Sequence, residues 1–388
     1  MAGAFAALAA LILGVRSDLS PATAALLVLA AAFLPPLLLD GLPRLRGRAP
    51  ARFDSDRLIA KLIGALCALG VATLAVAIFP FFHRDELAPL IAAAPTALAV
   101  FAPLIAAYVA LTDRLVEAPE DGLHALGLAV LGKPFDSARL ADFLRTLAIK
   151  LFFFTLMFAY LTADIAFYRE RGLPTALASH ADVMALNRLI FTCDTALAAL
   201  GYLATLKLFD WHVREADPSA SGWAACLVCY EPFFPALVNA FLGYSTGEAW
   251  RGVVAEGGAV YWLWVCAVLG CNFVYLLATV AFGPLFSNLT RRRIVTAGPY
   301  ALTKHPAYLA KNAGWWIADL PGFLALAPVE ALRKAAMLAC VSAIYRARAV
   351  TEERLLAADP VYGAYADHIA RHGLVARLRR AFAARLRS

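Results

Sequence analysis

Continuous apolar runs of about 20 residues make up most of the chain, and this is the length that a helix needs to cross the hydrocarbon core of a bilayer. The strands of a membrane barrel would instead alternate between apolar and polar residues, and these runs do not. We therefore predict an all-α, polytopic membrane helix bundle of about ten spans (8–10), of which the first and ninth are short. The ten apolar segments are 3–15, 20–39, 58–82, 89–111, 143–167, 187–208, 223–244, 258–285, 312–328 and 331–349.

The composition supports a membrane protein and excludes several other classes. Hydrophobic residues make up 62% of the 388 residues and charged residues only 16%, whereas charged residues are about 25% of a typical soluble protein. The 7 cysteines are too sparse for a disulfide scaffold. Cys226 and Cys229 form a C-x-x-C pair, but no second pair or histidine lies at metal-binding spacing, so we predict no metal site.

The basic residues between the apolar runs predict how the chain is oriented. The net charge of +7 does not indicate a nucleic-acid partner, because Lys and Arg are spread among the connections. Connection 41–57 holds five arginines and two aspartates, whereas 83–88 holds one arginine, one histidine and two acidic residues. By the positive-inside rule the first is cytoplasmic and the second is outside, which puts both termini in the cytoplasm. We expect an integral protein of a plasma membrane, the inner membrane of a bacterium. The other connections expected on the cytoplasmic side are 112–142, 209–222, 286–311 and the tail after 350.

Two segments leave the number of spans open. Segment 3–15 has the length of the apolar region of a signal peptide, but nothing charged precedes Arg16, and a signal peptide begins with a basic region. Segment 312–328 contains Pro321-Gly322 and can either cross the membrane or re-enter it. The stretch 123–131 is too short to span, and we place it at the membrane interface.

Five ionisable residues in or beside the spans are candidates for a substrate cavity. A charge at the bilayer centre is costly, so such a residue faces the bundle interior, where it either bonds a neighbouring helix or lines a cavity. Glu231-Pro232 also interrupts the regular backbone of its segment, which leaves carbonyl groups for a ligand. The stretch 210–214 before it is either an interfacial anchor or part of the same cavity. The candidate substrate residues are Asp164, Asp194, His212, Arg214 and Glu231.

A polar, turn-rich loop lies between two apolar segments at 296–311. Gly298-Pro299 predicts a turn, and Pro306 fits the first position of a new helix. The residue before it is held extended and is able to cap the helix. The free N–H groups of that terminus favour an anionic group such as a carboxylate or a phosphate, and Lys304 and His305 add donors beside it.

Two adjacent carboxylates, Glu352 and Glu353, protrude from the cytoplasmic continuation of the last span. They lie about 100° apart around a helix, so we expect one to face a site and the other to meet solvent or Arg348, four residues earlier. Tyr300 and Tyr308 offer flat faces for an aromatic ring or a cation. A carboxylate opposite a basic helix terminus is a bipolar pocket that suits a zwitterion. An ordinary solvated helix end is the alternative.

The order of these motifs resembles the C-terminal region of the isoprenylcysteine carboxyl methyltransferase family and of related membrane phospholipid methyltransferases. The motifs are G-P-Y-x-x-x-K-H-P-x-Y-x-A, then two apolar segments, Y-R-x-x-x-x-x-E-E-x-L-L and D-P-x-Y-x-x-Y. The resemblance implies an S-adenosylmethionine site built from the loop, the ends of the last two helices and the paired glutamates. Carried over by position, the cofactor-binding residues are Gly298, Tyr300, Lys304, His305, Tyr308, Glu352, Glu353, Tyr362 and Tyr365.

The resemblance covers only the C-terminal part of the chain. Where the family usually has Arg before His-Pro, this chain has Lys304, which keeps the charge but not the planar fork for bidentate contacts. Nothing upstream of about residue 285 aligns, so the substrate pocket is not inherited. We divide the chain into N-terminal helices of unknown role (1–220) and a methyltransferase-like membrane domain (221–388), with a cofactor loop at 296–311 and a C-terminal helix and tail at 345–388.

Methyl transfer from a sulfonium needs alignment and a dry site more than a strong acid or base. If the accepting atom is an amine or a thiol, a base must take its proton, and the candidate catalytic residues are Glu352, Glu353 and His305. The expected partners are membrane lipids and a hydrophobic acceptor, prenylated or lipid-like, that enters between the helices. Two other readings stay open: a nicotinamide-dependent membrane reductase of the sterol-reductase type, and a transporter or channel.

Overall fold

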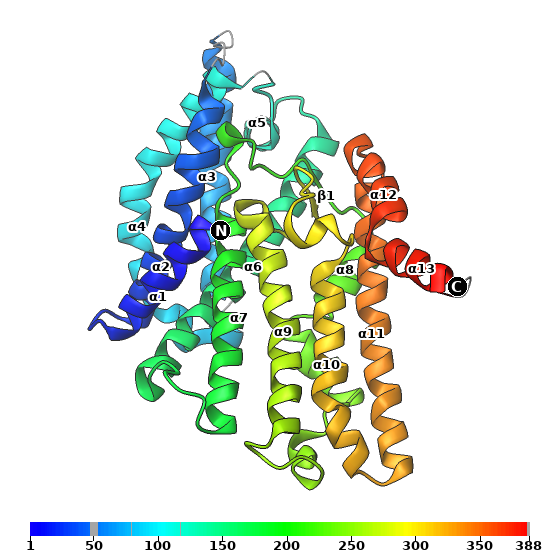
Figure 1. The fold of residues 1–388 in the computed structure, drawn as a ribbon. Coiled ribbons are helices and arrows are strands. Elements are labelled where there is room, and N and C mark those ends of the chain that lie inside the picture. Colours follow the sequence, from blue (N-terminus) through cyan, green and yellow to red (C-terminus); the bar gives the residue numbers. More distant parts are fainter. Residues whose placement is uncertain (47–52, 79, 117, 386–388) are drawn as a thin grey trace. The chain divides into compact units, whose positions relative to one another are not determined.

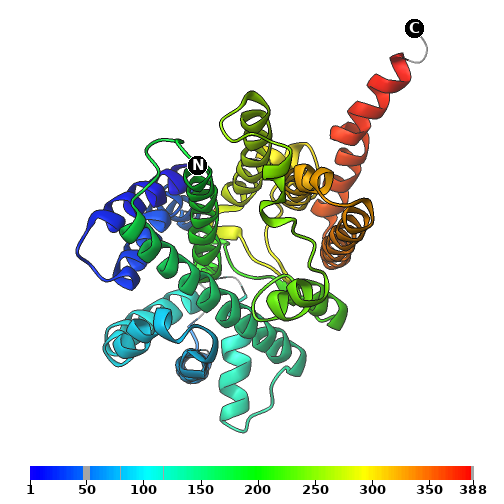
Figure 2. The same ribbon diagram turned by 90° about the horizontal axis from the view of Figure 1, so that it is seen from below.

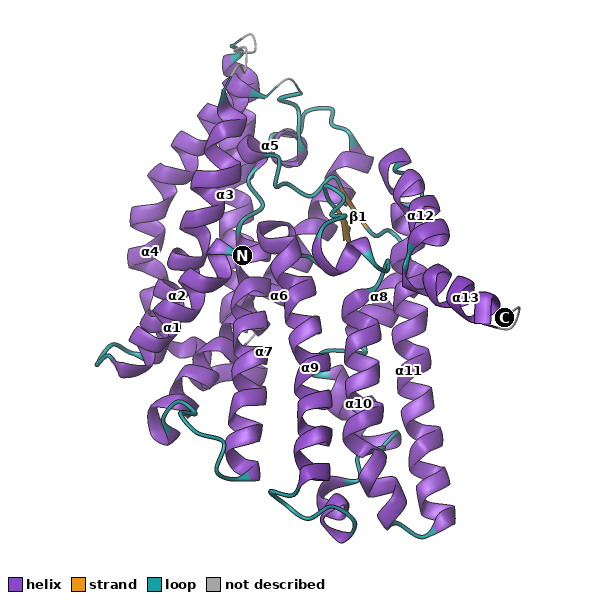
Figure 3. Ribbon diagram, viewed as in Figure 1, coloured by secondary structure: helices purple, strands orange, loops and turns teal. Residues whose placement is uncertain are grey.

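The structure, a computed structural model, describes residues 1–46, 53–78, 80–116 and 118–385. This described part is helical nearly throughout (Figures 1 and 3), and its strands are the antiparallel pair β1 (Glu215–Ala216) and β2 (Thr290–Arg291). The predicted all-α fold is confirmed for these residues. The helices are α1 (Ala2–Arg16), α2 (Pro21–Pro36), α3 (Ser55–Ile78), α4 (Pro80–Leu115), α5 (Gly122–Val130), α6 (Ser137–Arg171), α7 (His180–Leu203), α8 (Ala220–Leu227), α9 (Ala259–Phe282), α10 (Pro306–Ala325), α11 (Pro328–Leu356), α12 (Pro360–His372) and α13 (Leu374–Arg385).

The length and the apolar composition of several helices indicate a membrane protein. Five helical stretches of the described chain are long and apolar enough to cross a bilayer. They are Pro21–Leu45, Ser55–Ala77, Ser137–Arg171, His180–Leu203 and Ala259–Leu285. The short apolar stretch predicted at the interface is a helix of its own, α5, whose first turn is capped by Asp121.

The chain folds into two units that interleave along the sequence. The first unit comprises Met1–Gly172, Thr195–Pro218 and Gly283–Arg293, and the second comprises Leu173–Asp194, Ser219–Phe282 and Ile294–Ser388. Helix α7 therefore begins in the second unit and ends in the first. The whole cofactor loop and both glutamates predicted from the sequence belong to the second unit.

The structure corrects the predicted connection at 83–88, which lies inside the continuous helix α4. Helix α4 begins at Pro80, and a proline at the first position of a helix costs no hydrogen bond. The segment 83–88 contains Arg84, Glu86, Leu87 and Ala88, and these residue types all favour a helix. Part of the arginine-rich connection 41–57, residues 47–52, lies outside the described residues.

The segment predicted as a span at 223–244 is likewise not one helix. Helix α8 ends at Leu227, and a separate π-helical turn runs over Phe234–Asn239. The interruption falls at Glu231-Pro232, where the sequence indicated a break. By contrast α10 is continuous through Pro321 as far as Ala325.

Three long helices of the second unit, α9, α10 and α11, lie side by side, and the loop 296–311 lies at one end of them (Figure 1). The indole N–H of Trp264 on α9 donates to the Ile317 carbonyl of α10 over 2.8 Å. Lower on α10, the buried carboxylate of Asp319 accepts from the N–H of Thr246 over 2.7 Å and from its hydroxyl over 2.8 Å. These hydrogen bonds fix the position of α10 within the unit.

Candidate functional site

The loop before α10 is shaped by its backbone. Gly298 has φ of +63°, which a residue with a side chain rarely adopts, and it opens the 3-10 turn Gly298–Ala301. Pro306 is the first residue of α10, and His305 occupies the N-cap position. Its ring makes no capping bond, contrary to prediction, because it bonds a glutamate instead.

Lys304 and His305 both contact the carboxylate of Glu353. The Lys304 ammonium donates to Oε2 over 2.6 Å, and Nε2 of His305 lies 2.8 Å from Oε1. Burial alone would raise the pKa of Glu353, but the hydrogen bonds from Lys304 and His305 outweigh it and lower the pKa. Since the side chains of Lys304 and Glu353 are each about one third exposed (31% and 34%), a ligand can reach this pair.

Glu352 contacts the same helix start from the other side. The hydroxyl of Tyr308 donates to its Oε1, and Nδ1 of His305 lies 3.8 Å from its Oε2. Arg348, one turn earlier on α11, lies 3.6 Å from Oε1. The predicted contact of one glutamate with Arg348 is present at Glu352, but both glutamates, rather than one, also contact residues at the start of α10.

Aromatic rings enclose this charged group. The rings of His305 and Tyr308 stack with centroids 5.5 Å apart, and the guanidinium of Arg348 lies over the Tyr308 ring at 5.1 Å. It also lies over the ring of Tyr230, at 5.3 Å. Arg348 is 5% exposed, so its cation–π contacts form largely out of water, where such contacts are strongest.

Three of the predicted cofactor residues, Tyr300, Tyr362 and Tyr365, form a packed cluster with α9 and α12. The hydroxyl of Tyr365 donates to the Tyr300 carbonyl over 2.8 Å and to the Thr303 carbonyl over 3.2 Å. Burial raises the pKa of Tyr365 to about 12, so its hydroxyl remains a donor throughout the neutral range. These tyrosines hold the C-terminal tail against the loop.

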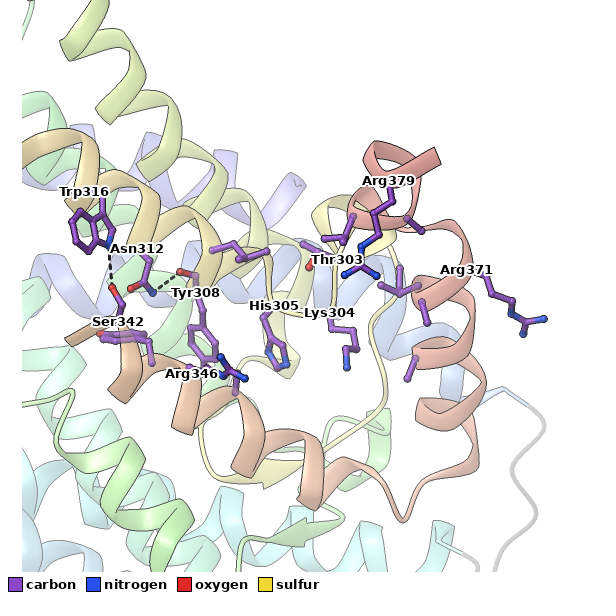
Figure 4. A pocket seen from close by; sticks show the side chains of 18 of the residues that line it. Thr303, Lys304, His305, Tyr308, Asn312, Trp316, Ser342, Arg346, Arg371 and Arg379 are labelled. Atoms are coloured by element: carbon purple, nitrogen blue, oxygen red, sulfur yellow. Dashed lines mark hydrogen bonds between the residues drawn. The ribbon is translucent and has the colours of Figure 1, made fainter. Parts of the chain in front are cut away.

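A cavity of about 940 Å³ opens beside the charged group (Figure 4). Its walls come from the loop, from one face each of α10 and α11, and from α12 and α13. Of the nine predicted cofactor residues, Lys304, His305 and Tyr308 line it, and the two glutamates contact these three. Its size is within the range of about 300–1,000 Å³ that is usual for small-molecule sites.

Sequence reasoning missed several residues of this cavity. Asn312 donates from Nδ2 to the Tyr308 carbonyl over 2.8 Å, and its buried Oδ1 has no hydrogen-bond partner among the described residues. A buried amide oxygen without a partner is costly, so it is available to a ligand donor. An asparagine one turn after Tyr308 in an apolar helix was the signal that could have identified it. Arg346, Arg371, Arg379 and Arg380 also line the cavity.

Lys311, at the end of the segment 296–311, is surrounded by aromatic rings. Its ammonium lies 5.4 Å from the ring centroids of Tyr275 and Trp315 and 5.5 Å from that of Tyr345. Asp194 on α7, which accepts a hydrogen bond from Thr279, is its electrostatic partner. Asp194 thus has the structural hydrogen-bond role that the sequence left open.

The five predicted substrate residues are divided between the two units. Asp164, His212 and Arg214 belong to the first unit, and Asp194 and Glu231 belong to the second. The cavity described above is lined by none of them. Burial lowers the pKa of His212, and the backbone N–H of Arg214 donates to the Arg291 carbonyl over 2.9 Å.

Comparisons of the chain with protein-family models, curated proteins and solved structures gave no match. The function proposed below therefore depends on the geometry of the site and on the C-terminal motifs.

Proposed function

We propose that the protein is an integral membrane methyltransferase that uses S-adenosylmethionine and resembles the isoprenylcysteine carboxyl methyltransferases. One observation carries the proposal. The basic start of α10 and the paired glutamates of α11 converge at the edge of a cavity that has mostly apolar walls. A cofactor with an amine and a carboxylate matches a site that already pairs a carboxylate with two cations.

The residues at this site fit such a cofactor. Its carboxylate would replace Glu353 as the partner of Lys304 and His305, while the freed glutamate would accept from its amine. Exchanging one internal ion pair for two ligand pairs leaves no buried charge without a partner. The unpartnered Oδ1 of Asn312 would accept a further hydrogen bond. The cofactor supplies an electrophilic methyl group on a sulfonium.

The acceptor would be hydrophobic: a prenylated, lipid-like or other small molecule that partitions into the membrane. The cavity is bounded by α10 and α11, so an acceptor in the bilayer could enter beside these helices. His305, Glu352 and Glu353 are the groups that could take a proton from an amine or thiol. We further propose about ten spans (8–10), both termini in the cytoplasm and insertion in a bacterial inner membrane.

Transfer of a labelled methyl group tests the proposal. The purified chain in lipid nanodiscs is incubated with S-adenosylmethionine carrying a tritiated methyl group and with a total lipid extract, and the organic phase is counted. We expect radioactivity in the organic phase, and loss of at least about ten-fold, or 1.4 kcal/mol, with Glu353→Gln. Glu330→Ala on the same helix, whose carboxylate pairs with the exposed Arg333, is the matched control. An organic phase without label from any lipid or prenyl extract would refute this function.

A further inference from the structure

The last helix of the chain, α13, exposes an apolar face that no part of the described chain covers. Leu374, Leu378 and Phe382 are spaced four residues apart and therefore share one face of the helix. Their exposed fractions are 44%, 60% and 65%. Apolar residues that are exposed singly are ordinary, but three on one helical face form a continuous patch.

Helix α13 also forms a wall of the cavity. Ala376 and Arg380 line the cavity from the side away from Leu374, Leu378 and Phe382, and Val375 and Arg379, which lie between the two sides, line it as well. Figure 4 shows Arg379 on this helix beside Thr303. Helix α13 is thus two-sided: one side closes the cavity and the other is apolar and exposed.

The direction of α13 is fixed by contacts at the start of the helix. The N–H of Leu374 donates to the Leu302 carbonyl over 2.7 Å. A Cβ on Gly373 would lie 2.6 Å from the Ile369 carbonyl oxygen and 2.9 Å from that of Leu302, so only glycine fits there. From this point α13 runs outward, across the direction of α10 and α11 (Figures 1 and 2).

The charge of the segment is uniformly positive. From His368 to the C-terminus there are six arginines and no acidic residue. A helix with an apolar face and flanking arginines has the composition of one that lies in the plane of a membrane surface, where acyl chains meet the apolar side and anionic head groups meet the arginines. Helix α13 also runs across the direction of α9, which is long and apolar enough to span a bilayer, and a helix in the plane of the surface has that orientation.

We propose that α13 docks on the anionic surface of the membrane in which the chain is embedded, and that this contact holds the outer wall of the cavity in place. The docking is independent of the chemistry in the cavity. Its consequence for a bound cofactor depends on the proposed function.

Hydrogen exchange of the full chain tests the docking. The protein is placed in nanodiscs of phosphatidylcholine alone and of phosphatidylcholine with 30% phosphatidylglycerol, and the exchange of amides 376–385 is followed by mass spectrometry. We expect exchange about ten-fold slower in the anionic nanodiscs, while α11 amides 332–345 exchange equally in both. Equal exchange of α13 in the two lipid compositions would overturn the proposal. So would protection that depends on protein concentration, which indicates a second copy.

Two variants distinguish insertion of the apolar face from a general effect of charge on the slowed exchange. Phe382→Glu places a carboxylate on the apolar face, and Ala383→Glu places the same charge on the neighbouring exposed residue, on the opposite side. We expect Phe382→Glu to abolish the lipid-dependent slowing and Ala383→Glu to retain most of it. Equal loss in both variants would contradict insertion of the apolar face. Because exchange is measured without cofactor, slowed exchange in a chain that transfers no methyl group leaves the docking intact and refutes only the proposed function.

Discussion

Two clusters of basic residues, 291–293 in the first unit and 304–305 in the second, look alike in the sequence and differ in what they contact. Arg292 is 4% exposed and donates to the carbonyls of Pro284 and Gly201 over 2.7 and 3.0 Å. Its neighbours pair with single carboxylates, Arg291 with Glu215 and Arg293 with Asp40, over 3.0 and 3.1 Å. This cluster holds loops and the strand pair together.

The second cluster contacts a single, partly exposed carboxylate. Lys304 and His305 share the carboxylate of Glu353, remain partly exposed and border a cavity. A buried cation bound to backbone carbonyls cannot release them without leaving several acceptors unpaired, whereas a half-exposed ion pair can accept a ligand with little loss. The comparison teaches that the charge of a basic cluster does not indicate its role. The groups that the cluster contacts, and whether a cavity lies beside it, distinguish a candidate site from a structural cluster.

The strongest test of this comparison removes one cation from each cluster. Arg292→Ala leaves two backbone carbonyls without their charged donor, so we expect the free energy of unfolding to fall by about 3 kcal/mol. Lys304→Ala removes a partly exposed ion pair, and the expected loss is at most about 1 kcal/mol. Denaturant unfolding of both variants in the same detergent measures the difference. Equal losses of unfolding free energy would mean that the two clusters contribute equally to stability.

A smaller effect is expected from pH, because the lowered pKa of Glu353 links its charge to folding. A carboxyl group whose pKa is lower in the folded state stabilises the fold at pH values above its ordinary pKa. This stabilisation is lost as the pH falls through the lowered pKa. We expect wild type to exceed Glu353→Gln in Tm by about 2 °C at pH 6, and the two to converge below pH 4. A Tm difference that does not change with pH would show that the Lys304–Glu353 pair contributes nothing to the fold.

The smallest expected effect is at Tyr365, which connects the tail to the loop by two hydrogen bonds. Tyr365→Phe keeps the ring packing and removes both bonds, so we expect about 1 kcal/mol less stability. The readout is faster hydrogen exchange in α12 with unchanged exchange in α11. Unchanged exchange in both helices would show that ring packing alone holds the tail.

The sequence was sufficient to predict the structural features that depend on residues adjacent in the chain. The loop before α10 and the glutamate pair of α11 could be predicted because turns, helix starts and helical spacing depend on adjacent residues. Most long apolar helices follow from hydrophobic runs for the same reason, whereas the predicted connection at 83–88 failed because charges alone do not end a helix.

The rest depended on tertiary contacts that no spacing encodes. That Glu352 and Glu353 both face the loop depends on how α10 and α11 pack. The roles of Arg348 and Asn312 also follow from that packing. The burial of Arg292 depends on its contacts with the carbonyls of Pro284 and Gly201. The substrate residues were grouped because each is polar in an apolar setting, and such polarity does not tell which ones lie together.

The most direct test of the central claim is a calorimetric titration of the full chain in nanodiscs with S-adenosylmethionine, with NADPH titrated in parallel. The predicted result is saturable binding of S-adenosylmethionine at one site and no binding of NADPH. The variant with His305→Ala, Glu352→Ala and Glu353→Ala is expected to bind at least about a hundred-fold more weakly, while Glu330→Ala binds as wild type does. Absence of binding in the wild type, or wild-type affinity in the folded triple variant, would contradict the claim that this charged group at the cavity edge is a cofactor site.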